Sequence, residues 1–189
     1  MQRSALSRIY RPIDSLLAVI AHIGSVAIVL LVFITMYDVS TRYLGLPKFA
    51  GLNSTMVQES EYWAHAFLFT LFIGYGYTRQ THVRIDLLRD LFSLKTKFWM
   101  ELICILALLV PFTTISIYYS FNYAMRSYID GEVSPSTNGL SHFWILKSTL
   151  VAMFVLMLLA GISQALKCID GLRGNLDEEQ SARALGRGH

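Results

Sequence analysis

The chain has 189 residues, of which 54% are hydrophobic and only 15% are charged, and its mean hydropathy is +0.47. This composition is typical of an integral membrane protein and excludes most classes of soluble enzyme. The formal net charge of +3 comes from basic loops, which favour contact with anionic lipid headgroups rather than with nucleic acid.

Four apolar stretches follow one another along the chain. Each has about 20 residues, the length that an α-helix needs to cross a hydrocarbon core of about 30 Å. A backbone in lipid must satisfy its own hydrogen bonds, so these stretches predict helices rather than strands. We therefore predict an all-α integral membrane domain over residues 1–172, with transmembrane helices at about 15–37, 57–78, 102–121 and 145–166. Pro111 predicts a kink in the third helix, with Thr113 or Thr114 satisfying the freed carbonyls.

Charged residues lie near the ends of the first, second and fourth predicted spans. Asp38 and Arg42 are four residues apart, so their side chains can meet on one helix face. Glu59 and Glu61 open the second span, near the positive end of its helix dipole. A carboxylate below the headgroups is costly unless it is paired, and Arg42 and Lys147 are the predicted partners. We interpret these five residues as charges for helix packing or for contact with a partner subunit.

The segment between the second and third spans has a different pattern. From Asp86 onward, apolar side chains share one helical face and charged side chains share the other. This pattern predicts an amphipathic helix at about 86–98 that lies in the membrane interface, although a packed linker is the alternative. His82 and Asp86 are too few ligands for a metal site.

The distribution of Lys and Arg predicts the orientation. Basic residues gather before the first span, between the second and third, and after the fourth: Arg3, Arg8, Arg11, Arg79, Arg84, Arg89, Lys95, Lys97, Lys167, Arg173, Arg183 and Arg187. The positive-inside rule therefore places both termini in the cytoplasm. We predict that residues 173–189 form a polar, disordered cytoplasmic tail.

Several motifs, in their order along a four-span chain, resemble one family. They are Asp38 with Arg42-Tyr43-x-Gly45-x-Pro47, Glu59-Ser-Glu61, Gly74, His82-Val-Arg-Ile-Asp86, Glu132-Val-Ser134 and Gly139-Leu-x-x-x-Trp144-Ile-Leu-Lys147. Together they resemble the small membrane subunit of tripartite ATP-independent periplasmic (TRAP) transporters, over roughly residues 12–170.

This resemblance implies a non-catalytic scaffold subunit without a cofactor, in the bacterial inner membrane. Its partners would be membrane lipids, a large multi-span subunit with the substrate and sodium sites, and a periplasmic binding protein that delivers an organic acid. Transport would be secondary symport driven by an ion gradient, with sodium as the expected ion. The amphipathic segment would correspond to the family's interfacial arm, represented here by His82, Arg84, Asp86, Leu87, Leu91 and Leu94.

Two other functions fit a small four-helix membrane protein. A membrane anchor for haem b or quinone would need histidines that face each other in the bundle, and His22 and His65 lie at different predicted depths. A stand-alone oligomeric channel or exporter would need a polar stripe through a span, which the sequence lacks. The transported compound cannot be predicted, because selectivity would lie in other chains.

Overall fold

The structure is a computed structural model, and it describes residues 5–49, 51–81 and 92–186. The helices are α1 (Ser7–Tyr43), α2 (Ser54–Thr78), α4 (Leu94–Cys104), the π-helix η1 (Ile105–Leu109), α5 (Val110–Ile129), α6 (Trp144–Leu172) and α7 (Glu178–Ala184). The described residues contain no strand, which confirms the all-α prediction.

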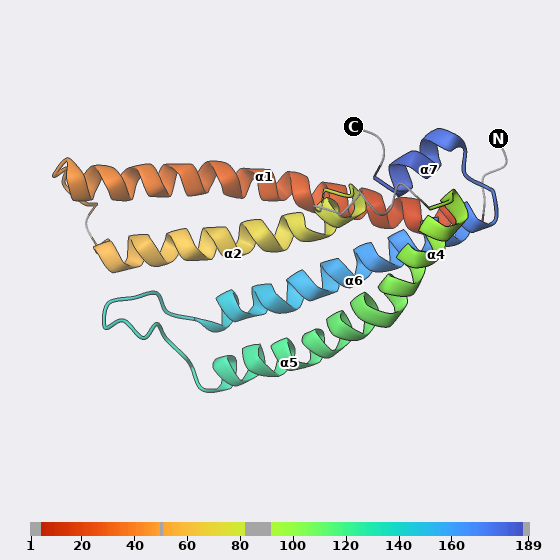
Figure 1. The fold of residues 1–189 in the computed structure, drawn as a ribbon. Coiled ribbons are helices and arrows are strands. Elements are labelled where there is room, and N and C mark those ends of the chain that lie inside the picture. Colours follow the sequence, from red (N-terminus) through yellow and green to blue (C-terminus); the bar gives the residue numbers. More distant parts are fainter. Residues whose placement is uncertain (1–4, 50, 82–91, 187–189) are drawn as a thin grey trace.

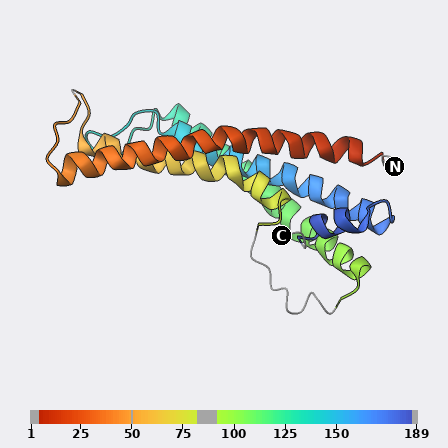
Figure 2. The same cartoon turned by 90° about the horizontal axis from the view of Figure 1, so that it is seen from above.

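The long helices form an elongated bundle (Figures 1 and 2). Helix α1 packs against α2, α2 against α6, and α6 against α5. The chain runs up and down the bundle, so the start of α1 and helix α7 lie toward one end and the 130–143 loop lies at the other (Figure 1). The end of the bundle that holds the start of α1 and α7 is called the terminal end below, and the opposite end is called the loop end.

Among the described residues, three helices are long and apolar enough to cross a membrane: α1, the continuous Leu94–Ile129 helix and α6. Helix α2 has 25 residues and is not one of these three. The second of the four predicted spans therefore stays a prediction. At 37 residues, α1 is about 55 Å long, so it extends beyond a hydrocarbon core of about 30 Å.

The third long helix begins earlier than the predicted span at 102–121. Leu94 already starts α4, so residues 94–98 of the predicted interfacial helix belong to this continuous helix. The reason is burial, because Phe98 is only 2% exposed and its ring lies against Gly171 of α6. Residues 86–91 of the predicted interfacial helix lie outside the described residues.

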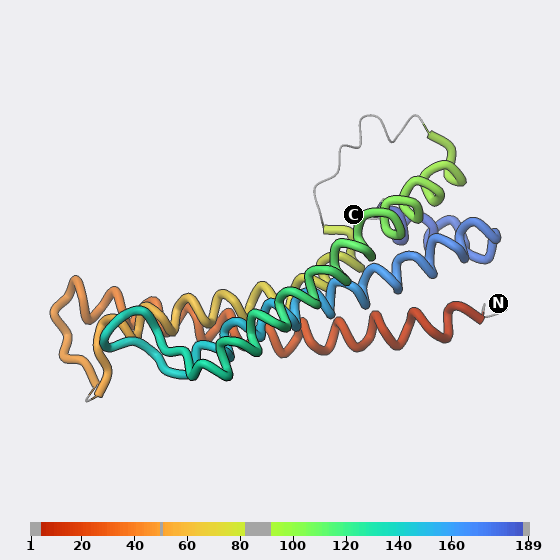
Figure 3. The backbone as a smooth tube through the Cα atoms, turned by 90° about the horizontal axis from the view of Figure 1, so that it is seen from below, coloured from red at the N-terminus to blue at the C-terminus, as the bar shows by residue number. Residues whose placement is uncertain are grey.

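A π-helical turn precedes Pro111 in this helix. The amide of Val110 donates to the carbonyl of Ile105, five residues earlier. Pro111 has no amide hydrogen, so the carbonyl of Ala107, four residues earlier, loses its usual helical donor. The hydroxyls of Thr113 and Thr114 donate to the carbonyls of Leu109 (2.8 Å) and Val110 (2.7 Å) respectively, and not to that of Ala107. The helix curves as it passes from α4 into α5 (Figure 3). The predicted role of the two threonines is therefore wrong, because each hydroxyl reaches the carbonyl one turn before its own residue and not the one that Pro111 frees.

Small residues allow the helices to approach closely. A Cβ on Gly74 of α2 would lie 2.8 Å from Leu17 Cδ2 of α1 and 3.0 Å from the Leu156 carbonyl oxygen of α6. Leu17, Leu156 and the fully buried Ala160 form one core cluster at this crossing. Packing of this kind, rather than burial from water, holds helices together in a membrane.

The described residues 173–186 include a helix that packs on the bundle, where the sequence predicts a disordered tail. Glu178–Ala184 form α7, and Leu185 after it is 1% exposed in a cluster with Phe98, Leu102 and Cys168. The side-chain amides of Gln80 and Gln164 donate to the carbonyl of Ala184, at 3.0 and 2.6 Å. The tail is polar on average, but its apolar residues are covered by α4 and α6, which composition alone does not reveal.

Candidate functional site

Arg42 links the end of α1 to the start of α2. Its guanidinium pairs with the Asp38 carboxylate one turn earlier, and Asp38 is 7% exposed. The Gln58 amide oxygen of α2 accepts from both terminal guanidinium nitrogens, at 2.7 Å each. The structure thus brings Asp38 and Arg42 together at the predicted spacing, and it adds Gln58, which sequence reasoning did not select. A single oxygen that accepts from both terminal nitrogens restricts how the guanidinium can turn.

Glu59 of α2 binds the 130–143 loop. One carboxylate oxygen accepts from the Ser134 hydroxyl, and the other accepts from the Leu140 amide at 2.6 Å. The space around this contact is filled, since a Cβ on Gly139 would lie 2.4 Å from Ser134 Cβ and 2.5 Å from Glu59 Oε1. Asn53, which caps α2, also donates to the Asn138 carbonyl at 2.9 Å. The start of α2 therefore holds the 130–143 loop in place through hydrogen bonds.

Lys147 of α6 has a different partner from the predicted one. Its ammonium pairs with Glu132 of the loop and lies 3.9 Å from the centre of the Tyr123 ring. The Lys147 contact holds the pKa of the Glu132 carboxyl below its usual value of 4.5. The predicted pairing of Lys147 with Glu59 or Glu61 is therefore wrong, because the loop folds back and supplies the partners of both charges.

Glu61 makes no hydrogen bond through its buried Oε1 to any residue that the structure describes, and the same holds for the indole nitrogen of Trp63 and for Asp38 Oδ1. Arg42 lies close enough to Glu61 for a favourable charge interaction. A buried polar atom without a hydrogen-bond partner costs free energy. These atoms therefore mark a place where a contact with another molecule would be favourable. The three atoms all belong to the loop-end halves of α1 and α2.

A second charged cluster, which sequence reasoning missed, lies at the terminal end. Asp14 of α1 pairs with Lys167 of α6 at 2.7 Å and also accepts from the Ser163 hydroxyl. The signal was present, because Asp14 directly precedes the first predicted span and Lys167 directly follows the fourth. Both helix ends lie on the same side of an up-and-down bundle, so opposite charges there can meet.

The residues of the predicted interfacial arm are mostly outside the described part of the chain. This applies to His82, Arg84, Asp86, Leu87 and Leu91, whereas Leu94 is the first residue of α4 and is 49% exposed. Their role as an arm therefore stays a prediction.

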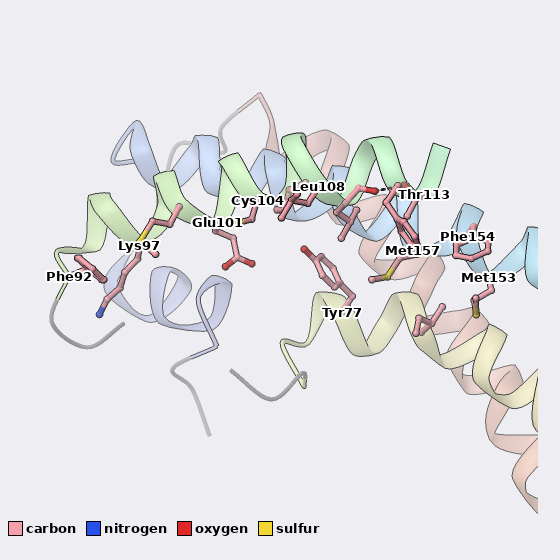
Figure 4. Close-up of a pocket in the computed structure, with 15 residues that line it drawn as sticks. Tyr77, Phe92, Lys97, Glu101, Cys104, Leu108, Thr113, Met153, Phe154 and Met157 are labelled. Carbon is pink, nitrogen blue, oxygen red and sulfur yellow. Dashed lines mark hydrogen bonds between the residues drawn. The ribbon is translucent and has the colours of Figure 1, made fainter. Parts of the chain in front are cut away.

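A large apolar hollow separates the end of α2 from the α4–η1–α5 helix. Its volume is about 1020 Å³, and it is lined mainly by aliphatic, aromatic and Met side chains (Figure 4). Its charged lining residues among those described, Lys97 and Glu101, lie toward one end, while Thr113, Met153 and Phe154 lie toward the other (Figure 4). Polar groups therefore do not converge on one point, as they would to hold an organic acid.

Histidine geometry does not favour a haem site. The Nδ1 atoms of His22 and His65 each contact a carbonyl oxygen of their own helix, at 2.6 and 3.0 Å. Gly24 of α1 lies against Leu71 and Phe72 of α2, so His22 and His65 differ in depth by roughly 10 Å. No group of three or more metal-ligating side chains occurs among the described residues.

Comparison with protein families decides the classification. The model of the DctQ component of tripartite ATP-independent periplasmic transporters matches residues 31–171, which is most of the chain. The chain belongs to the DctQ family. DctQ is a family of transporter subunits rather than of enzymes, and its members work with a large subunit, DctM, and a binding protein, DctP.

The DctQ match confirms the resemblance noted in the sequence, and with the apolar helices it identifies a membrane protein. It extends from within α1 to the end of α6 and so includes Asp38, Arg42, Glu59, Glu61 and Lys147. No curated protein and no solved structure matches the chain.

Proposed function

We propose that this chain is the scaffold subunit of a secondary importer of organic acids, driven by an ion gradient, with sodium as the coupling ion. It would support a DctM-type large subunit that is fed by a periplasmic DctP-type protein. The observation that carries the proposal is the DctQ match over residues 31–171. We place the chain in the bacterial inner membrane with both termini in the cytoplasm, on the basis of its basic loops.

The contacts of the described charges support a structural role. Arg42, Glu59 and Lys147 each bind another segment of this chain at the loop end. The outer surface of the bundle is apolar, with Phe33 66% and Leu108 68% exposed, as expected for contact with lipid or with another membrane subunit. The unpartnered atoms of Asp38, Glu61 and Trp63 lie on the same part of the molecule and favour a further contact there.

The first experiment is affinity purification of the chain from its native membrane in mild detergent, with mass spectrometry and a visible spectrum. The proposal expects a large multi-span protein to co-purify without haem absorption. A haem spectrum with soluble redox subunits, or the chain alone, would contradict it.

A second experiment separates a scaffold from a substrate site. Glu61→Gln and Arg42→Gln should reduce the yield of assembled complex more than they change substrate affinity in the complexes that do assemble. Arg126→Gln is the matched control, since Arg126 is exposed near the same end of the bundle. Normal assembly with weaker substrate or sodium binding would refute the scaffold role.

A further inference from the structure

A pocket of about 660 Å³, lined by both polar and apolar side chains, lies at the terminal end of the bundle. Four cations line it, and each comes from a different part of the fold: Arg11 from α1, Arg79 from the end of α2, Lys167 from α6 and Arg183 from α7. Among the described residues, Asp14 is the one carboxylate in its lining. Because α7 supplies one wall, this pocket exists only when the tail is folded onto the bundle.

The described residues do not fully compensate the positive charge of the pocket. Asp14 is already neutralised by Lys167 at 2.7 Å, and Arg183 pairs at 2.5 Å with Glu179 on its own helix. Neither Arg11 nor Arg79 forms an ion pair with any residue that the structure describes. Two guanidinium groups thus face one pocket without counter-charges from the described chain.

The donors suit a phosphate group. A guanidinium presents a rigid fork of donors that matches phosphate oxygens, and the Gln180 amide in the same lining can add another. Arg79 lies 5.1 Å from the centre of the Tyr75 ring, a contact that limits how its guanidinium can turn. The helix dipole of α2 would by itself favour a cation at position 79, at the carbonyl end of that helix. It does not explain why cations from three other elements line the same pocket.

We propose that this pocket binds a phosphate-bearing anion, and its depth favours the headgroup of an anionic phospholipid. Arg11 lies shortly before the first predicted span, Arg79 directly after the second and Lys167 directly after the fourth. All three are therefore at headgroup level, on the side where anionic lipids and basic pockets between helices occur together. The pocket volume falls within the range of ordinary ligand sites. The inference goes beyond the proposed transport role, since it needs no partner subunit.

The test is native mass spectrometry of the detergent-purified full chain with phosphatidylglycerol, phosphatidylcholine or inorganic phosphate added separately. The wild type should retain phosphatidylglycerol in preference to phosphatidylcholine. Arg11→Gln and Arg79→Gln should each reduce this retention about fivefold. The matched control is the double variant Arg8→Gln with Arg173→Gln, which removes two exposed cations from the same end without touching the pocket lining.

Each outcome has a defined meaning. If the retention of phosphatidylglycerol falls in Arg11→Gln and Arg79→Gln but not in the control, the pocket is a lipid site. If the retention of inorganic phosphate shows this pattern instead, the ligand is a soluble anion. An equal loss in the control variant would show general charge attraction and overturn the proposal, as would retention of neither anion. Gln180→Glu adds a negative charge from a different element and should also weaken binding. Circular dichroism of each variant establishes that the helices are intact.

Discussion

At the level of single residues, the loop end is organised by charges whose partners lie far along the chain. Glu59 and Leu140 are separated by 81 positions, yet they are joined by a 2.6 Å hydrogen bond. Lys147 binds Glu132 across the turn that leads into α6. These contacts fix the 130–143 loop against α2 and α6.

Substitution of Glu59 tests this support directly. Glu59→Gln should destabilise the loop by about 1–3 kcal/mol, because an amide cannot replace both charge-assisted acceptors. Hydrogen exchange of the amides in residues 130–143 should become faster. Glu61→Gln, two residues later on the same helix, should leave this exchange unchanged, since Glu61 makes no hydrogen bond to the loop among the described residues. Equal effects of both variants would refute the assignment.

The contact between Glu132 and Lys147 predicts a pH dependence. The pKa of Glu132 is lowered in the folded chain, mainly by the Lys147 hydrogen bond, so folding favours its ionised form. Its contribution to stability should be present at neutral pH and above 4.5, and should be lost as pH falls through the lowered folded pKa. The protection of the amides in residues 130–143 against hydrogen exchange should therefore fall at low pH in the wild type. In Glu132→Gln this pH-dependent fall should be absent.

At the level of elements, two segments differ from what their local sequence suggests. Helix α4 continues through η1 into α5, and the π-turn directly before Pro111 allows the helix to pass the proline without ending. Helix α7 has only seven residues, too few to be stable alone. Its stability must come from docking, through Leu185 and through the hydrogen bonds of Gln80 and Gln164 to Ala184.

Helix α7 should therefore be released by a single polar substitution. Leu185→Ser places a hydroxyl in a site that is 1% exposed and removes the apolar contact that docks the tail. Trypsin should then cleave after Arg183 much faster than in the wild type. Glu178→Gln changes an exposed residue of the same helix and should not alter the cleavage rate. Unchanged cleavage in Leu185→Ser would contradict the docked arrangement.

At the level of the whole molecule, the up-and-down path brings the start of α1, the end of α2 and helix α7 together, and residues of all three line one pocket (Figure 1). This path places the two charge clusters at opposite ends, with the Glu59 and Lys147 contacts at one and the Asp14–Lys167 pair at the other. If α2 crosses the membrane, as the three candidate spans are long and apolar enough to do, the residues before and after it lie on opposite sides.

Labelling of single cysteines tests this topology, including the second span. In a Cys104→Ser background, in which the remaining Cys168 is buried, an impermeant maleimide should label Lys48→Cys and Ser136→Cys on intact spheroplasts. Thr81→Cys and Arg173→Cys should react only after the membrane is permeabilised. Labelling of both Lys48→Cys and Thr81→Cys from outside would show that α2 does not cross.

Much of the architecture follows from local chemistry. Runs of about 20 apolar residues must be helical in lipid, so the fold class and three of the long helices could be predicted from composition and length. The Asp38–Arg42 contact is similarly local, since helix geometry alone brings side chains four residues apart together.

Only the tertiary structure decided which distant groups meet. Glu59 was paired with Arg42 or Lys147 on charge and side alone, whereas the folded loop supplies backbone and hydroxyl donors that have no sequence signature. The tail was predicted from its polarity to be disordered, whereas a buried Leu185 and two distant glutamines hold it. The sequence by itself determined the apolar helices, because hydrophobicity and backbone hydrogen bonding act within a segment. The partners of charges, the position of α7 and the basic pocket depend on how segments pack, so they were decided by the fold.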